Sequence, residues 1–310
     1  MRLVFMGTPG FALPSLEMLL DSEHDLLAVV TRPDRPQGRG LKEAPPPVKE
    51  FARERGLTVF QPQNLRQEDF VSGLTELQAD LFVVVAFRIL PREVYTMPPK
   101  GTIDLHPSML PRYRGAAPIN WAIINGETET GVSVFFIGEK IDAGDIILQR
   151  PVPIGPEETA GELSHRLARI GAQAILEAVD SIADDRVAGS TQPAGEPSAA
   201  PKIKREDGRI VWSRPAGQVK NLIRGLNPKP GAFTTAGDRV LKIHQAQLTD
   251  MVPSELQPGQ VVKIDAQKGV FVSTGEGVLL LQEVQLEGKK RMSAADFLRG
   301  FHLQEGDLLV

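Results

Sequence analysis

Short, continuously apolar runs alternate with segments of helical periodicity through the first half of the chain, and this alternation most limits the possible folds. Runs without polar interruption are typical of strands in a parallel sheet that helices cover on both faces. We therefore predict an α/β fold with a doubly wound, Rossmann-like, mostly parallel sheet. The predicted strands lie at Arg2–Met6, Leu26–Thr31, Leu57–Phe60 and Leu81–Phe87, and the predicted helices at about Ala12–Leu20, Val48–Arg55 and Asp69–Gln78.

The pattern changes after Ala188–Pro201, a stretch rich in Gly, Ser, Ala and Pro that is typical of a linker. Beyond it, short apolar runs are separated by Gly and Asp turns, which favours a small β-barrel of OB-like type. We expect an N-terminal domain at 1–188, a linker at 189–204 and a C-terminal barrel at 205–310. The predicted barrel strands are Val240–Ile243, Gln260–Ile264, Gly269–Ser273 and Val278–Gln282.

Composition excludes several classes of function. The chain has no cysteine, so disulfides, thiolate metal sites and a cysteine nucleophile are excluded. Its net charge of −4 gives no global attraction to nucleic acid, so a polyanionic partner must be met by local basic patches. Gly7 and Pro9 interrupt the first apolar run, and no stretch approaches membrane-spanning length. We expect a cytoplasmic protein that does not bind a membrane.

The densest group of polar and rigid residues lies at Thr102–Asn120. A strand there carries Asp104 and His106, which point to the same face because side chains alternate along a strand. Both are expected at the carboxyl end of a parallel strand, where open α/β sheets bind their ligands. A second acidic segment, Glu139–Gln149, contains Asp142. Spacing alone favours a structural turn for Asp142.

Long motifs then connect the chain to a known family. The segment HPSMLPRYRGAAPIN, followed by NGETETGVSVFFIGEKIDAGDIILQ, resembles the formyltetrahydrofolate-dependent formyltransferases. The resemblance covers nearly the whole length and includes MGTPGFA, TRPDRPQGRG, VWSRP, LNPKPGAF and KKRMSAADFL. It implies transfer of a formyl group from 10-formyltetrahydrofolate, acting as co-substrate, to an amine, and no metal is required. Such acyl transfer needs a neutral attacking amine, donors for the developing oxyanion and a route for the proton.

The resemblance also assigns catalytic roles. It implies that His106 lies near the oxyanion and that Asp142 tunes this histidine or relays protons. The third catalytic position of the family is Asn, and here it is Asp104. An ionised Asp cannot donate a hydrogen bond. Three interpretations stay open: Asp104 is protonated because Asp142 is near, His106 acts alone with reduced turnover, or the chain is a weak enzyme that still binds its substrates.

Further residues follow from the resemblance. It implies that the folate contacts Phe87, Arg88, Ile89 and Leu90, and also Ser108, Met109, Leu110 and Pro111. Ser133 matches a family position near the site, and an equally good interpretation is a strand hydroxyl that is satisfied locally.

The basic loop Arg32–Lys42 matches a family loop that meets the acceptor end of tRNA, with contacts implied for Arg35, Arg39 and Lys42. Ordinary solvated charge is the alternative for this loop. The same alternative holds for the other basic clusters, at Lys202–Arg205, at Lys220, Arg224 and Lys229, and at Lys289–Arg291.

The implied acceptor is the α-amine of methionine on initiator Met-tRNA, which gives N-formylmethionyl-tRNA for translation initiation, and the resemblance implies a monomer. A second interpretation keeps the folate donor but takes an amino sugar nucleotide or a glycinamide ribonucleotide as acceptor. A third, which rests on Asp104, is a catalytically impaired protein that binds tRNA or folate.

Overall fold

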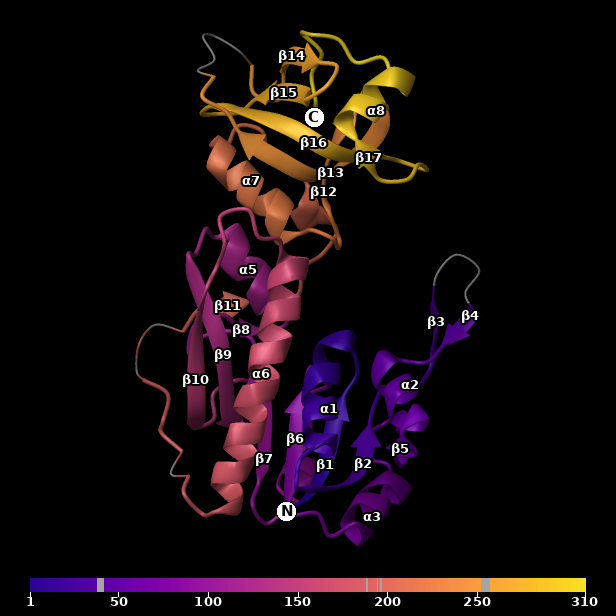
Figure 1. The fold of residues 1–310 in the computed structure, drawn as a ribbon, viewed down its shortest axis with the longest axis vertical. Helices are drawn as coiled ribbons and strands as arrows, with labels where there is room; N and C mark the ends of the chain where they lie inside the picture. Colours follow the sequence, from indigo (N-terminus) through magenta and orange to yellow (C-terminus); the bar gives the residue numbers. More distant parts are fainter. Residues whose placement is uncertain (38–41, 188, 194, 196, 252–256) are drawn as a thin grey trace. The chain divides into compact units, whose positions relative to one another are not determined.

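The structure is a computed structural model that describes residues 1–37, 42–187, 189–193, 195, 197–251 and 257–310 (Figure 1). The chain forms two compact units that are interleaved along the sequence. The first unit contains Met1–Gly115, Glu129–Pro153 and Ser164–Ala200, and the second contains Ala116–Thr128, Ile154–Leu163 and Pro201–Val310. In the part of the chain that the structure describes, no helix is both long enough and apolar enough to cross a membrane.

A seven-stranded sheet in the order β10-β9-β7-β6-β1-β2-β5 is the centre of the first unit. The neighbours from β7 to β5 pair in parallel, whereas β9 is antiparallel to both β7 and β10. The mostly parallel α/β sheet predicted from the sequence is therefore confirmed. The strands are β1 (Arg2–Gly7), β2 (Asp25–Val30), β5 (Val59–Phe60), β6 (Leu81–Val85), β7 (Thr102–His106), β9 (Glu129–Phe136) and β10 (Ile146–Pro153).

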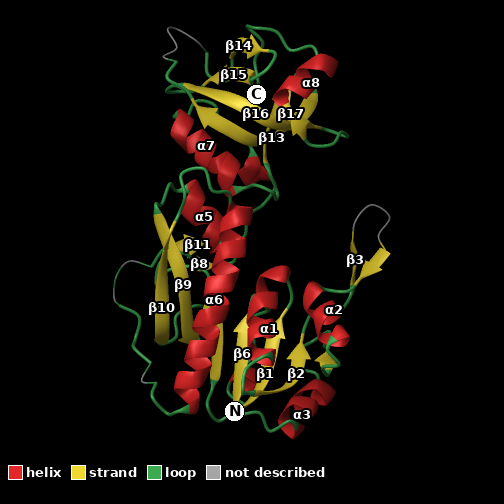
Figure 2. Cartoon of the chain, viewed as in Figure 1, coloured by secondary structure: helices red, strands yellow, loops and turns green. Residues whose placement is uncertain are grey.

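Helices cover both faces of this sheet, which explains why its central strands are apolar throughout. Phe82 and Val84 of β6 pack with Phe70 of α3 in one apolar cluster. On the opposite face, Gly171 of α6 lies against Leu105 of β7, where an added Cβ would come within 2.5 Å of the leucine side chain. The helices are α1 (Leu13–Leu20), α2 (Pro47–Glu54), α3 (Glu68–Glu76), α4 (Arg92–Tyr95) and α6 (Ala160–Ala183), and α6 belongs to this unit from Ser164 onward. Figure 2 labels α1, α2, α3 and α6.

Two local features differ from the sequence prediction. Strand β6 ends at Val85 rather than Phe87, because Ala86 takes a left-handed conformation with φ of 50° that breaks the ladder. The basic loop contains a short antiparallel hairpin, β3 (Arg35–Gln37) with β4 (Lys42–Ala44).

The second unit contains an antiparallel sheet in the order β12-β13-β16-β15-β14, with β17 paired to β16. The end of the chain closes it, since Leu309 bridges Ala236 at one edge and Leu308 bridges Gln260 at the other. The predicted C-terminal β-barrel is therefore confirmed. Its elements are β12 (Ala232–Ala236), β13 (Arg239–Leu248), β14 (Val261–Asp265), β15 (Gly269–Ser273), β16 (Val278–Leu286) and β17 (Met292–Ser293), with α5 (Pro118–Ile124), α7 (Ala216–Gly225) and α8 (Ala294–Gly300).

Candidate active site

The carboxyl end of β7 presents Asp104 and His106. The strand lies between β6 and β9, and the backbone of His106 is paired with that of Ser133 on β9. Because the two residues are two positions apart, their side chains leave the same face of the sheet. The strand therefore delivers an acid and a histidine together at the edge where α/β sheets bind ligands.

His106 is almost fully buried, and one of its ring nitrogens is already bonded. Its Nε2 lies 2.8 Å from the carbonyl oxygen of Tyr113. A carbonyl can only accept, so Nε2 carries the hydrogen and Nδ1 of the neutral ring keeps a lone pair. Burial lowers the pKa of His106, while Asp142 and the bond to Tyr113 raise it in part. The ring is therefore neutral near pH 7, with an acceptor nitrogen at Nδ1.

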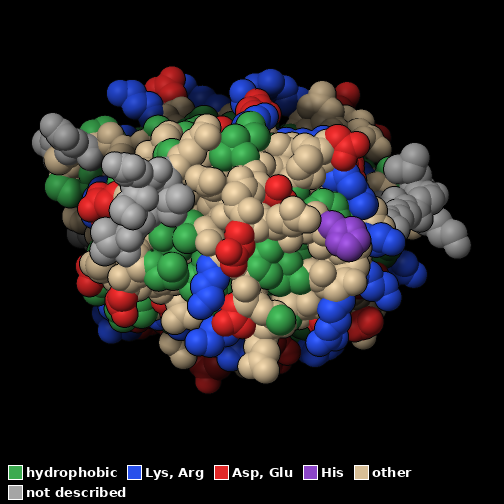
Figure 3. All heavy atoms as spheres, turned by 90° about the horizontal axis from the view of Figure 1, so that it is seen from above, with side chains coloured by type: hydrophobic (Ala, Val, Ile, Leu, Met, Phe, Trp, Pro, Cys, Tyr) green, Lys and Arg blue, Asp and Glu red, His purple; other side chains and the backbone are tan. Residues whose placement is uncertain are grey.

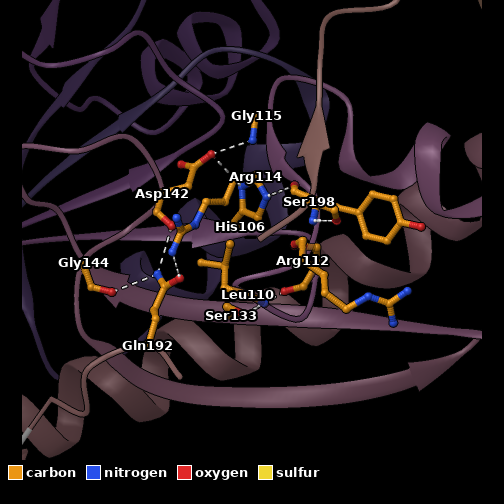
Figure 4. A network of polar contacts seen from close by, with 12 residues as sticks. His106, Leu110, Arg112, Arg114, Gly115, Ser133, Asp142, Gly144, Gln192 and Ser198 are labelled. Atoms are coloured by element: carbon orange, nitrogen blue, oxygen red, sulfur yellow. Dashed lines mark hydrogen bonds and ion pairs between the residues drawn. The ribbon is translucent and has the colours of Figure 1, made fainter. Parts of the chain in front are cut away.

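Asp142 faces this acceptor nitrogen (Figure 4). Its Oδ2 lies 3.8 Å from Nδ1 of His106 and accepts a hydrogen bond of 2.8 Å from the amide of Gly115. The backbone of Asp142 has a φ of 50°, in the left-handed region. Gly144 completes the turn, where a Cβ would come within 1.7 Å of the carbonyl oxygen of Phe136. Asp142 is thus a turn residue, as spacing favoured, but the turn brings its carboxylate beside His106.

The carboxyl group of Asp104 is enclosed on one side. Its Oδ1 is buried and has no hydrogen-bond partner among the described residues. The pKa of Asp104 is raised well above its ordinary value, first by burial and second by the charge of Asp142, while a bond from the amide of Leu105 acts against this rise. Burial of a charge without a partner is unfavourable, so the protonated form is stabilised. A neutral carboxylic acid can donate a hydrogen bond, unlike the ionised form.

Ser133 holds the loop that follows His106. Its Oγ donates to the carbonyl of Ser108 at 2.7 Å and accepts from the amide of Leu110 at 3.1 Å. The same oxygen accepts from Nε2 of Gln149 at 2.7 Å. The hydroxyl is therefore satisfied locally and fixes the backbone of Ser108 and Leu110, while Met109 and Pro111 on the same loop are half-buried.

A cavity of about 540 Å³ lies beside the predicted folate-binding stretch after β6. Ile89 is 74% exposed, and Ile141, next to Asp142, is 59% exposed. Two other residues of this stretch have partners within the protein. Arg88 donates to the carbonyls of Pro62 and Gln63, and Phe87 is partly buried against the apolar cluster of β6 and α3. The lining residues are Gln63, Asn64, Leu65, Arg66, Arg88, Ile89, Leu90, Pro91, Arg92, Tyr95 and Glu139.

The basic hairpin is anchored at its base by an acid. Lys49 donates to both carboxylate oxygens of Asp34, and Gln61 donates to Oδ1 of Asp34 at 2.8 Å. Of the predicted tRNA-binding residues, Arg35 is exposed on β3 and Lys42 belongs to β4. Arg39 lies outside the described residues.

Three residues named in the basic clusters beyond the hairpin, Lys220, Arg224 and Arg291, have ion-pair or hydrogen-bond partners inside the second unit. Lys220 is buried and paired with Glu157, and Arg224 is buried and donates to the carbonyls of Gly155 and Glu158. Arg291 is paired with Glu283. On the face shown in Figure 3, basic side chains lie scattered among acidic and apolar ones. The structure therefore removes Lys220 and Arg224 from the surface charges that could meet a nucleic acid.

Sequence reasoning missed Gln192 and Ser198, which lie in the stretch predicted as a linker. Gln192 donates to the carbonyl of Asp142, and the hydroxyl of Ser198 accepts from the amide of Tyr113, whose carbonyl bonds His106. The Gly, Ser and Pro composition gave no signal for either residue. The segment is also paired to the first unit through β11 (Ala199–Ala200) and β8 (Arg114–Gly115).

Comparison with known proteins gives this site a class. Residues 1–179 match the formyl transferase family model, and residues 202–302 match the model of the formyl transferase C-terminal domain. The chain belongs to the formyl transferase family.

Similar proteins extend over the whole chain. It is 46% identical over 310 residues to the methionyl-tRNA formyltransferase of Pelotomaculum thermopropionicum, covering 100% of this chain and 98% of that one. It is 48% identical over 311 residues to the methionyl-tRNA formyltransferase of Moorella thermoacetica, covering 100% and 99%. The fold also resembles HypX from Aquifex aeolicus in complex with tetrahydrofolic acid, with a TM-score of 0.68 at 18% identity, covering 100% of this chain and 50% of that one.

Proposed function

We propose that this chain transfers the formyl group of 10-formyltetrahydrofolate to the α-amine of methionine on initiator Met-tRNA, in the cytoplasm, for translation initiation. The observation that carries the chemistry is the meeting of three groups at one strand end. His106 offers a neutral acceptor nitrogen, Asp142 a carboxylate facing it, and Asp104 a carboxyl whose pKa is raised by burial. The full-length similarity to methionyl-tRNA formyltransferases supports the acceptor.

The folate supplies the formyl carbon that the amine attacks, and the residues of this chain handle charge and protons. Asp104, when protonated, donates a hydrogen bond to the oxygen of the formyl group as negative charge develops there. This replaces the amide donor that the resemblance would place at the same position. One such donor contributes roughly 100- to 1000-fold in rate.

The attacking amine becomes positively charged and must lose a proton. Nδ1 of His106 is the acceptor, because Nε2 is held by the carbonyl of Tyr113. Once protonated, the ring is stabilised by the carboxylate of Asp142, and the proton is then returned to the leaving nitrogen. A positioned acid–base group of this kind contributes roughly 100- to 10,000-fold.

The chain's own residues fit a folate at this edge. The exposed Ile89 lines the cavity, and the exposed Ile141 offers an apolar contact on the loop that carries Asp142. The loop of Ser108, Met109, Leu110 and Pro111 is rigidly held by Ser133. A flat, partly polar ring needs apolar contact together with a few fixed backbone groups, and these loops supply both.

The acceptor is tested by comparing substrates. We expect formyl transfer to initiator Met-tRNA, and none to an amino sugar nucleotide or to glycinamide ribonucleotide under the same conditions. Transfer to a free nucleotide would support the second interpretation. Tight binding of Met-tRNA and folate without transfer would support a catalytically impaired protein.

The hairpin residue Arg35 gives a sharper test of tRNA binding. Each phosphate contact that is lost reduces the slope of log affinity against log salt concentration by about one. We expect Arg35→Ala to weaken Met-tRNA binding and flatten its salt dependence, while folate affinity is unchanged. Arg55→Ala, another exposed arginine of the first unit, is the matched control. Equal salt slopes for parent and Arg35→Ala would remove Arg35 from the tRNA contacts.

A further inference from the structure

The buried side chain of Gln192 makes three hydrogen bonds next to the turn that carries Asp142 (Figure 4). Its Nε2 donates to the carbonyl of Asp142 at 2.9 Å and to the carbonyl of Gly144 at 3.0 Å. Its Oε1 accepts from Nη2 of Arg114 at 2.5 Å. A primary amide has two N–H donors and one oxygen, so each part of this group has a defined partner.

The turn that Gln192 holds is one that the backbone does not favour by itself. Asp142 has a φ of 50°, in the left-handed region where the Cβ of a side chain comes too close to the following carbonyl oxygen. The two carbonyls bonded by Gln192 lie on either side of Ala143 and fix the turn from within. Without these donors, both carbonyls would lose their partner and the turn could relax.

The contacts also form a closed ring around the site. Gln192 bonds the backbone of Asp142, and the carboxylate of Asp142 accepts from the amide of Gly115. Gly115 follows Arg114 directly in the chain, and the side chain of Arg114 donates to Gln192, which closes the ring. The ring determines both the place of the Asp142 backbone and the direction of its carboxylate, which faces His106.

We propose that Gln192 is a positioning residue that holds the carboxylate of Asp142 at its distance from His106. It acts through Asp142, and its kinetic consequence rests on the proposed function. A displacement of about 1 Å in a group that moves a proton is enough to lower a rate by as much as 100-fold.

Two substitutions separate the roles of this amide. Gln192→Met keeps the length of the side chain and removes all three bonds. Gln192→Glu keeps an acceptor for Arg114 and removes both donors to the turn. We expect both variants to lose roughly 10- to 100-fold in kcat, with KM for both substrates nearly unchanged.

Thr191→Ala, an exposed neighbour on the same segment, is the matched control and should have the kcat and KM of the parent. Full activity of Gln192→Glu would overturn the proposal, because the donors to the turn would then be dispensable.

A second measurement needs no substrate. The His106 ring can be titrated by NMR in the full chain, with the fold of each variant checked by circular dichroism. Asp142 raises the pKa of His106 whereas Arg114 lowers it. Loss of Gln192 loosens Asp142 and Arg114, whose effects oppose each other, and the effect of Asp142 is the larger of the two. The His106 pKa should therefore fall in Gln192→Met. This shift would support the inference even if the parent failed to formylate Met-tRNA, and an unchanged titration together with unchanged kcat would overturn it.

Discussion

Nδ1 of His106 lies 3.8 Å from Oδ2 of Asp142, and the two atoms do not share a hydrogen bond. A bond between nitrogen and oxygen needs about 2.7–3.2 Å, so the gap must close by about 1 Å before Nδ1 can donate to the carboxylate. In the neutral ring Nδ1 is an acceptor, as the carboxylate is. A proton that arrives on Nδ1 therefore creates the attraction between the two groups.

Asp142→Asn should lower turnover by roughly 100- to 10,000-fold, because the imidazolium loses its counter-charge. Asn tolerates the left-handed φ of this position and still accepts from Gly115, so the fold should persist. The His106 pKa should fall, since Asp142 raises it in the parent. Single-turnover formyl transfer and NMR titration measure the two effects. Asp145→Asn, an exposed acid of the same turn, is the control, and an equal loss there would argue against a specific role for Asp142.

Asp104→Asn should change the pH dependence of the rate. In the proposed mechanism the parent needs a protonated Asp104 as donor, so its rate should fall as the pH rises through the raised pKa of this carboxyl. Asn donates at every pH, so Asp104→Asn should be faster than the parent only at pH values above that pKa. Asp104→Ala, which has no donor, should lose roughly 100- to 1000-fold throughout. Superimposable pH–rate profiles for the parent and Asp104→Asn would show that Asp104 does not titrate in the catalytic range.

The same substitution should affect stability. A carboxyl whose folded pKa lies above its unfolded value favours the fold at low pH, and this contribution is lost as the pH rises through the folded pKa. The pKa of Asp104 is raised by burial and by Asp142. The parent and Asp104→Asn should therefore have similar Tm values near pH 4, and the variant should become the more stable one as the pH rises. A Tm difference that does not vary with pH would contradict the raised pKa.

Ser133→Ala should destabilise the first unit and disturb the loop after His106. It leaves the amide of Leu110 and Nε2 of Gln149 without this acceptor, and an unsatisfied buried group costs about 1–3 kcal/mol. The loop that carries Ser108 should shift, so KM for the folate should rise. Chemical denaturation and steady-state kinetics measure the two effects. Ser72→Ala, on an exposed helix face, should leave both quantities at the parent values.

The sequence by itself determined the frame of the site. Apolar runs such as that of β6 require burial on both faces, and this requirement leaves few architectures besides a helix-covered sheet. The alternation of side chains along a strand placed Asp104 and His106 on one face before any tertiary contact was known. Both results follow from local periodicity, which a sequence expresses directly.

The tertiary structure alone decided how the site is completed. Asp142 comes beside His106 only because a left-handed turn, Gly144 and the amide of Gly115 aim its carboxylate there. Gln192 lies in a stretch whose composition indicated only a linker, yet it bonds that turn. The pKa of Asp104 depends first on how far its carboxyl is removed from water. Burial and hydrogen bonds between distant segments depend on how the chain packs, and local sequence patterns do not express them.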